Sequence, residues 1–312
     1  MLIVELQHLG HEVTLFAHKD SKVSCKHIPY KTDKSGLKND LLNTWAINKY
    51  LLKNKVDVIH SFGRLAYLLP QLHKSLPKLM SYQREPTLKQ IKRAVSLSKK
   101  RSLAFTGCSD YISNKIKLYA PTFTVYNGVN TSSYQFNPLV DEDAPLVFLG
   151  RIEHIKGAHI AVEIALKTNK RLVIAGNIPS EAQKYFDTKV SPFLNDKITY
   201  IGPVDDNQKN QILGQSAALL MPILWDEPFG IVMVEAMACG TPVIALKRGA
   251  VPEVVTDSLN GYTATTTGQL IEKVALLPQI DRKSVRATVE EKFSAESIAA
   301  DYVQVYQKLI NA

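Results

Sequence analysis

Cysteine is scarce in this sequence, and long apolar runs are missing. The three cysteines, Cys25, Cys108 and Cys239, lie far apart among 312 residues, so neither a disulfide framework nor a zinc site of the usual spacing is expected. No apolar run approaches the roughly 20 residues of a membrane-spanning helix. The first residues, MLIVELQHLGHEV, lack the basic start of a signal peptide. We therefore expect a soluble, cytoplasmic protein without a bound metal.

The signatures of several common protein classes are absent as well. There is no G-x-G-x-x-G of a dehydrogenase, no G-x-x-x-x-G-K-[ST] of a P-loop NTPase and no G-x-S-x-G of a hydrolase. No pattern of an RNA-recognition motif, a zinc finger or a helix-turn-helix is present, so nucleic acid is not an expected partner.

The net charge of +9 is unevenly distributed. Residues 1–139 contain 21 lysines and arginines and 8 acidic residues, a net charge of +13, whereas residues 140–312 contain 17 and 21, a net charge of −4. This contrast suggests two domains with different partners. Six cations gather in residues 89–101 beside Ile91, Val95 and Leu97. The stretch predicts either an interfacial helix on the inner face of an anionic membrane or a helix whose apolar residues face the core.

Short apolar runs alternate with helical patterns along the chain. We predict strands at Glu12–Ala17, Val56–His60, Lys78–Ser81, Ser102–Gly107, Thr122–Tyr126, Leu146–Leu149, Arg171–Ala175, Ile198–Ile201, Ala217–Met221 and Pro242–Ala245. We predict helices at Asp40–Asn54, Lys89–Lys100, Gly157–Leu166, Ser180–Val190, Asn207–Leu213, Ile231–Ala238 and Ala295–Ile310. Runs such as VFLG and LVIAG are apolar on both faces, which is typical of strands covered by helices on both sides.

This alternation indicates an α/β protein with two Rossmann-like, doubly wound parallel sheets facing a central cleft. The polar segment Asn130–Pro145 separates the two series. We place the first domain at residues 1–137 and the second at 138–294, and we expect the last helix, residues 295–312, to pack back on the first domain. Ligands of such sheets bind beyond the carboxyl ends of the strands, so we expect the chemistry in the loops that follow the second-domain strands.

Two of these loops carry informative charged residues. Arg151 follows a strand and Lys156 precedes a helix; two such cations suit a diphosphate, although surface cations in any loop would look the same. The second loop, Glu227-Pro-Phe-Gly230, opens a helix whose free N–H groups form an anion site. Glu235 lies in the apolar run IVMVEAMA of that helix. An unpaired charge is costly there, which favours a functional role over a solvated helix face.

The run Glu227-Pro-Phe-Gly-x4-Glu235, followed by Ala-x-Ala-x-Gly240-Thr-Pro-Val, resembles the signature of the group 1 (family four) retaining glycosyltransferases of GT-B fold. Gly150-Arg151 with Lys156-Gly157 is similar to the diphosphate-binding element of that family. Further landmarks follow in the family's order: Val173-Ile-Ala-Gly176, Tyr200-Ile-Gly202, Val251-Pro-Glu253 and Asn260-Gly261. The resemblance covers nearly the whole chain and is most specific in residues 146–262.

The resemblance implies metal-independent, retaining transfer of a sugar from a UDP- or GDP-linked donor to a glycan, lipid or small-molecule acceptor. No cofactor is implied beyond the nucleotide sugar itself. Arg151 and Lys156 would neutralise the leaving diphosphate, Glu227 would bind the donor sugar near its C3 hydroxyl, and Glu235 would bind the ribose hydroxyls. The remaining donor-binding candidates are Phe229, Gly230, Ile231 and Val232 at the helix start, with Asn177 and Val204 near the base. Asp205-Asp206 is better explained as a helix N-cap than as a metal site.

The first domain departs from the family pattern in two places. Many relatives carry a histidine beside the anomeric centre, where this sequence has Gln83 and Arg84; His60, at the end of another strand, is either an alternative or a structural residue. The family's first strand and Gly-rich loop do not precede Gly10-His-Glu-Val, and residues 1–9 suit the end of a helix. The strands Glu12–Ala17 and Val56–His60 would then pair directly or leave an open edge. The rival to an active transferase is an impaired homologue that binds nucleotide or sugar without transfer.

Overall fold

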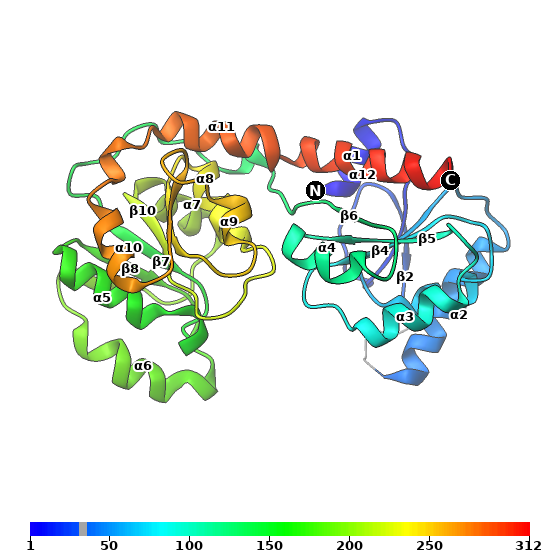
Figure 1. Ribbon diagram of the computed structural model, residues 1–312, viewed down its shortest axis with the longest axis horizontal. Coiled ribbons are helices and arrows are strands. Elements are labelled where there is room, and N and C mark those ends of the chain that lie inside the picture. Colours follow the sequence, from blue (N-terminus) through cyan, green and yellow to red (C-terminus); the bar gives the residue numbers. More distant parts are fainter. Residues whose placement is uncertain (31–35) are drawn as a thin grey trace. The chain divides into compact units, whose positions relative to one another are not determined.

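The computed structural model describes residues 1–30 and 36–312 and divides into two compact units (Figure 1). Unit 1 comprises Met1–Asn127 with Ala295–Ala312, and unit 2 comprises Gly128–Ser294. Every paired strand in both units runs parallel to its neighbour. The expected α/β class with a parallel sheet in each domain is thus confirmed. Across the described chain, no helix is both long and apolar enough to cross a membrane.

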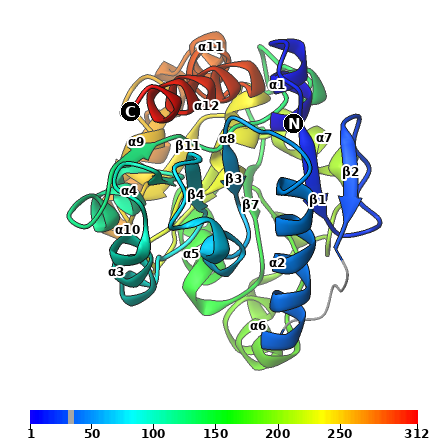
Figure 2. The same cartoon turned by 90° about the vertical axis from the view of Figure 1, so that its right-hand side faces the viewer.

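Unit 1 contains a four-stranded sheet in the order β3-β4-β5-β6 and a separate pair, β1-β2 (Figure 2). The strands are β1 (Thr14–Ala17), β2 (Lys26–Pro29), β3 (Ile59–Ser61), β4 (Lys78–Tyr82), β5 (Leu103–Gly107) and β6 (Thr122–Thr124). The helices are α1 (Leu2–His8), α2 (Leu37–Leu51), the 3₁₀ helix η1 (Leu65–Gln71), α3 (Leu88–Leu97), α4 (Asp110–Lys117) and α12 (Ala295–Ile310).

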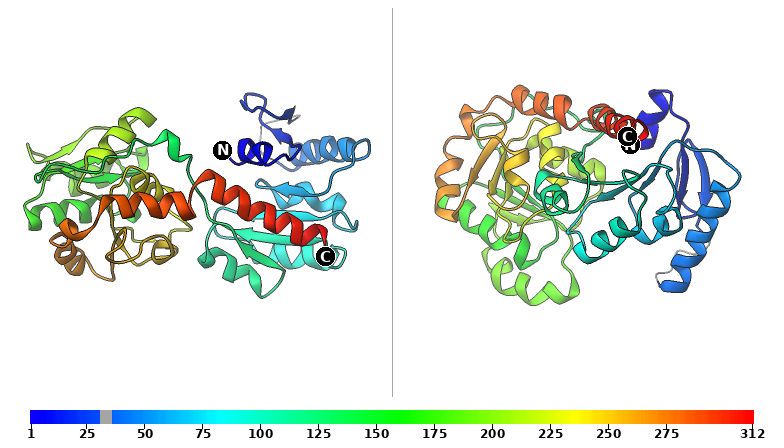
Figure 3. Two further views of the ribbon diagram at one scale, coloured as in Figure 1. Left: turned by 90° about the horizontal axis from the view of Figure 1, so that it is seen from above. Right: turned by 45° about the vertical axis from the view of Figure 1, so that its right-hand side comes forward.

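Helices cover both faces of the four-stranded sheet because its side chains alternate between them. Met80 and Phe105 pack with Ile91 of α3 and Ile116 of α4 on one face. On the other face, Leu79 and Ala104 pack with α12, and α1 lies alongside α12 (Figure 3). Helix α12 therefore completes the core of unit 1, although it is more than 160 residues away from β6 in the sequence.

The strands β1 and β3 do not pair with each other. Within the described residues, β1 pairs only with β2, and β3 pairs only with β4. Of the two outcomes expected from the sequence, the open edge is therefore the one observed. Residues 2–8 form a helix, as the pattern of Leu2, Ile3 and Leu6 predicts.

The packing of helix α3 distinguishes between the two alternatives for residues 89–101, an interfacial helix or a helix whose apolar residues face the core. Ile91 and Ala94 are buried, and Val95 packs against the same core, whereas Leu97 is exposed. Most of the apolar side of this helix thus faces the core of unit 1. Its lysines and arginine remain at the surface; Lys92 Nζ lies 4.4 Å from the centre of the Tyr119 ring.

Unit 2 is a six-stranded sheet in the order β12-β11-β10-β7-β8-β9. The strands are β7 (Leu146–Leu149), β8 (Leu172–Ala175), β9 (Ile198–Tyr200), β10 (Ala218–Met221), β11 (Val243–Leu246) and β12 (Gly261–Ala264). The helices are α5 (Ala158–Thr168), α6 (Gln183–Lys189), α7 (Asp206–Gln215), α8 (Ile231–Ala238), α9 (Val251–Val254), α10 (Thr267–Val274) and α11 (Arg282–Lys292). Strands β7 and β10 are adjacent at the centre, so the loops that follow them emerge side by side.

The segment 128–137 belongs to unit 2, which corrects the boundary expected after residue 137. The buried Arg282 guanidinium donates to the carbonyl oxygens of Asn137, Gly214 and Ser216 at 2.8–2.9 Å. Arg286 donates to Thr131 O and Tyr134 O, both at 3.1 Å. These arginines fasten a polar segment, which by composition resembles a linker, to the body of unit 2.

Candidate active site

Backbone contacts hold the loops at the carboxyl edge of the unit 2 sheet together. Ile152 N donates to Asn177 O at 2.9 Å, and Leu224 N donates to Ile155 O at 2.8 Å. Gly157 has a positive φ of 79°, and a Cβ there would lie 2.1 Å from Pro222 O. Only glycine therefore allows the Lys156–Gly157 turn to approach the loop after β10. The sequence-predicted residues of the second domain are brought to one edge of one sheet by this packing.

Lys156 and Glu227 meet in this region. Lys156 Nζ lies 3.0 Å from Glu227 Oε2, and Trp225 Nε1 donates to the same oxygen at 3.1 Å. The ammonium group also lies 4.7 Å from the centre of the Trp225 ring. Both charged side chains are largely buried, at 21% and 12% exposure. The indole of Trp225 thus fixes Glu227 and stacks against Lys156 at once, a role that the sequence alone did not reveal.

Arg151 is paired with a carboxylate of its own loop. Its guanidinium lies 2.7 Å from Glu153 Oε1, in an ion pair whose geometry is not that of a hydrogen bond. The Arg151 side chain is 57% exposed, far more than Lys156. Arg151 is therefore more accessible than Lys156, whose ammonium group is paired with Glu227.

The start of α8 lies next to Glu227. Gly230 is the N-cap, with φ 80°, and a Cβ there would lie 2.8 Å from the terminal methyl groups of Met221 and Met233 and 3.2 Å from Glu227 Cγ. The N–H groups of Ile231 and Val232 belong to the first turn, where helical N–H groups have no acceptor within the helix. They carry the positive end of the helix dipole, which favours an anion.

Glu235, in the second turn of α8, is bound by two groups from distant parts of the sequence. Lys209 Nζ lies 2.7 Å and Tyr134 OH 2.9 Å from the same oxygen, Oε1. Burial opposes the charge on Lys209, but the hydrogen bonds to Glu235 and Asp206 raise the pKa of its ammonium group. Burial and the neighbouring Glu235 carboxylate likewise raise the pKa of Tyr134. Lys209 and Tyr134 are 26 and 101 residues from Glu235, too far for any local pattern to reveal the contact.

The other donor-site candidates differ in what they can offer a ligand. The Phe229 side chain is 2% exposed and packs edge-on against Phe293 at 5.9 Å, so it supports the loop from within the core. Asn177 is exposed and Val204 half-buried, both after strands at the same edge. Asp205 caps α7 through a capping box with Gln208, as expected from the sequence. Among the residues that the structure describes, no group of three His, Cys, Asp or Glu side chains could hold a metal ion.

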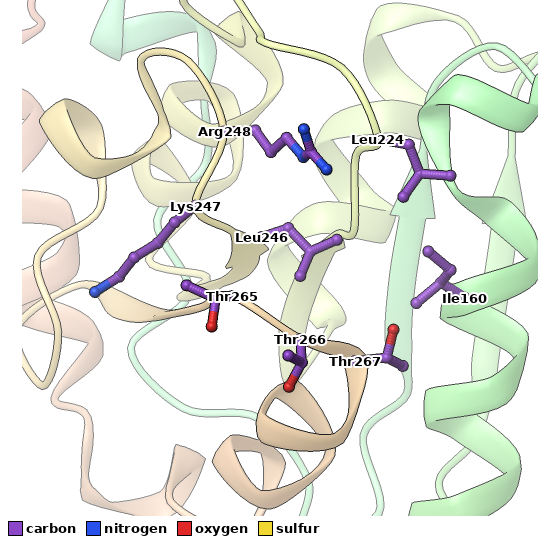
Figure 4. A pocket seen from close by; sticks show the side chains of 8 residues that line it. All are labelled: Ile160, Leu224, Leu246, Lys247, Arg248, Thr265, Thr266 and Thr267. Carbon is purple, nitrogen blue, oxygen red and sulfur yellow. The ribbon is translucent and has the colours of Figure 1, made fainter.

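A small cavity of about 280 Å³ lies beyond the ends of β11 and β12 (Figure 4). Its lining residues are Ile160, Leu224, Leu246, Lys247, Arg248, Thr265, Thr266 and Thr267. The Arg248 side chain extends towards Leu224, whereas Lys247 extends away (Figure 4). Ala250 N donates to Glu227 O at 2.8 Å, so this loop also supports the one that carries Glu227.

In unit 1, His60 has a structural role. Its Nδ1 lies 2.7 Å from Tyr306 OH and its Nε2 lies 2.6 Å from Ser81 Oγ, so both ring nitrogens are occupied. Burial lowers the pKa of this histidine to about 3, which leaves it neutral. Gln83 and Arg84 directly follow β4 and are exposed.

Residues 131–290 match the family model described as "Glycosyl transferases group 1". This match spans half of the chain. The chain belongs to the group 1 glycosyl transferases. The two loops in which the sequence shows features of this family, the Glu227 loop and the Arg151–Lys156 loop, lie inside the matched region.

Individual proteins are similar over nearly the whole length of this glycosyl transferase. Spore coat protein SA of Bacillus subtilis (strain 168) is 24% identical over 347 aligned residues, which cover 96% of this chain and 90% of that protein. The sucrose-phosphate synthase structure from Thermosynechococcus elongatus superposes with a TM-score of 0.78 at 19% identity, covering 99% of this chain and 92% of that one. The Anabaena protein HepE in complex with UDP-glucose superposes with a TM-score of 0.68 at 17% identity, covering 91% and 86%. At these identities the structural likeness shows the fold, which is GT-B.

Proposed function

We propose that this glycosyl transferase moves a sugar from a nucleoside-diphosphate sugar to a hydroxyl acceptor with retention of anomeric configuration. The observation that carries the proposal is the meeting of Lys156, Glu227 and the start of α8 at one sheet edge. A nucleotide sugar needs cations for its diphosphate and hydrogen-bond acceptors for its hydroxyl groups, and both are present there. The likeness to a fold solved with UDP-glucose supports a donor of this class.

Each charged residue has a distinct task in this proposal. The diphosphate binds Arg151, Lys156 and the N–H groups of Ile231 and Val232. Lys156 then shifts from Glu227 to the phosphate, which leaves Glu227 to accept a hydrogen bond from the sugar. Glu235 Oε1 is occupied by Lys209 and Tyr134, so Oε2 is the oxygen that we assign to the ribose hydroxyls.

The transfer itself needs no protein base in this proposal. The bond between the anomeric carbon and the phosphate oxygen breaks, and the acceptor oxygen bonds to the same face of that carbon. The acceptor proton passes to the leaving phosphate oxygen. Arg151, Lys156 and the helix dipole stabilise the charge that develops on the diphosphate, the task that a divalent cation performs in other transferases. Added chelator should accordingly leave the rate unchanged.

We assign the acceptor, which is a glycan, a lipid or a small molecule, to unit 1. Gln83 and Arg84 are the candidates for contact with it, since they are exposed at the carboxyl end of β4. An anionic partner could also meet the surface cations of residues 89–101. Because Ile91 faces the core, that contact would be electrostatic rather than an insertion of the helix.

The decisive experiment measures binding and transfer separately. Calorimetry with UDP, GDP and ADP identifies the base, and NMR of the product reports the anomeric configuration. The double variant Arg151→Ala/Lys156→Ala should lose nucleoside diphosphate affinity by about 1.5–3 kcal/mol or more, with little change for the nucleoside. Unchanged diphosphate affinity would place the donor elsewhere. Tight nucleotide binding without transfer to any acceptor would favour the impaired homologue instead.

A further inference from the structure

Helix α2 of unit 1 carries several large apolar residues on the outside, although its Ile47 is buried. Leu41, Leu42, Trp45 and Leu52, just past its end, are 61%, 42%, 56% and 79% exposed. Asn43 and Thr44, by contrast, are 3% and 7% exposed and face inward. A surface helix of a globular protein normally shows the opposite arrangement.

The inward-facing polar side chains of α2 are satisfied by hydrogen bonds. Thr44 Oγ1 donates to Asp40 O at 2.6 Å, and Asn48 Nδ2 donates to Thr44 O at 2.7 Å. Gln71 donates to the Asn48 side-chain oxygen, and Tyr50 OH lies 3.0 Å from Thr14 Oγ1. The first two bonds lie within α2, whereas those to Gln71 and Thr14 join its polar side to the rest of unit 1 and leave the apolar side outside.

The exposed side of α2 is an apolar stripe with lysines at its ends. At 100° per residue, positions 38, 41, 42, 45, 49 and 52 fall within an arc of about 100°. Lysines stand at both ends of this stripe, Lys38 before the leucines and Lys49 and Lys53 near its end. Lys49 Nζ lies 5.0 Å from the centre of the Trp45 ring. The one acidic residue between positions 36 and 55, Asp40, is 15% exposed and paired with Arg64 at 2.8 Å.

We propose that α2 lies in the headgroup region of an anionic lipid membrane, with Leu41, Trp45 and Leu52 inserted and the flanking lysines on lipid phosphates. A tryptophan amid aliphatic residues with lysines at the edges suits the boundary between headgroups and acyl chains. The net charge of +13 on residues 1–139 adds attraction to such a surface. A second copy of the chain fits less well, because pairing two such stripes would bring lysine against lysine. The inference concerns unit 1 and stands independently of the donor chemistry proposed for unit 2.

The test uses the whole chain and vesicles of phosphatidylcholine with or without phosphatidylglycerol. We expect flotation with the anionic vesicles only, weakening as salt is added. The emission of Trp45 should shift to the blue on binding. The chain has two tryptophans, so the shift is assigned by its loss in Trp45→Phe while Trp225 remains.

Matched variants test whether vesicle binding depends on the α2 stripe or on any exposed apolar side chain. Leu52→Ser and Trp45→Ser should each weaken vesicle binding on the order of tenfold. Leu118→Ser is the control, because Leu118 is 83% exposed in the same unit but away from α2. Lys38→Gln and Lys49→Gln should each cost about fivefold. Thermal melting and nucleotide binding report whether each variant is folded.

Three results would overturn the inference. The first is equal vesicle binding by Leu52→Ser, Leu118→Ser and the unaltered chain. The second is binding that depends on Lys89 and Arg93 of α3 but not on the stripe. The third is absence of vesicle binding together with a change of oligomeric state in Trp45→Ser, which would make the stripe a protein interface.

Discussion

Lys156 Nζ and Glu227 Oε2 lie 3.0 Å apart, so the cation assigned to the diphosphate and the carboxylate assigned to the sugar neutralise each other. In the proposed function, Lys156 must therefore leave Glu227 and bind the diphosphate when the donor binds. Glu227→Gln keeps the size of the side chain and removes its charge, which releases Lys156. Free nucleoside diphosphate should bind equally well or several-fold more tightly, whereas transfer should fall by about 3 kcal/mol in transition-state stabilisation, roughly a hundredfold. Calorimetry and initial rates check the two parts. A Glu227→Gln enzyme that loses affinity for free nucleotide would contradict the assignment.

Lys209 and Tyr134 are expected to act through Glu235, since both bind its Oε1. Lys209→Met should weaken nucleotide binding by about 1–2 kcal/mol while leaving inorganic pyrophosphate affinity unchanged. Tyr134→Phe removes a hydrogen bond without a charge and should cost less. Competition between nucleotide and pyrophosphate measures the difference. If both ligands weaken equally, Lys209 supports the fold of the site rather than the ribose contact.

His60 should make unit 1 sensitive to acid. Burial lowers the pKa of the folded histidine to about 3, whereas an unfolded histidine titrates near 6.5. The unfolded state therefore binds the extra proton first, and stability is lost as pH falls below about 6.5. The loss should reach roughly 2 kcal/mol at pH 5. Urea unfolding at pH 7 and pH 5 should show this difference in the unaltered chain and not in His60→Gln. Parallel pH slopes for the two proteins would disprove it.

From the open edges of β1 and β3 we predict that an added strand would raise both the melting temperature and the transfer rate. A chain with about twenty family-like residues placed ahead of Met1, the length of a strand, a turn and half a helix, should melt at a higher temperature and transfer sugar faster. The physical reason is that unpaired strand backbone is costly and invites association. Differential scanning calorimetry and initial rates compare the two chains. Equal melting temperatures and rates would show that the edges of β1 and β3 need no partner.

The sequence predicted the central strands well because their runs are apolar on both faces. All ten expected strands are present, and Leu146–Leu149 and the helix Ile231–Ala238 have the expected bounds. The strands β2 and β12 were missed because KHIP is polar and GYTA begins with glycine. Helix α11, RKSVRATVEEK, was missed because most of its residues are charged or polar.

The site was predictable where one motif contains it and not where distant residues meet. Glu227, Gly230 and Glu235 share one loop and helix, so a single stretch of sequence places all three. Trp225 lies just ahead of that motif, and no local pattern reveals that its indole donates a hydrogen bond to Glu227. Arg282 and Arg286 lie about 150 residues from the carbonyl groups that they bind in the segment 128–137. Tertiary hydrogen bonds of this kind decide a domain boundary that composition alone misplaces.

Unit 2 is one continuous stretch of chain, whereas unit 1 is assembled from both ends of it. During synthesis the residues that we assign to the donor can therefore fold together as soon as residue 294 has emerged. The sheet of unit 1 cannot complete its core at that point, because Leu79 and Ala104 are covered by α12, which follows unit 2 in the chain. Until α12 arrives, that apolar face is open to water and to chaperones. The sixteen residues of α12 thus decide when unit 1 can complete its core.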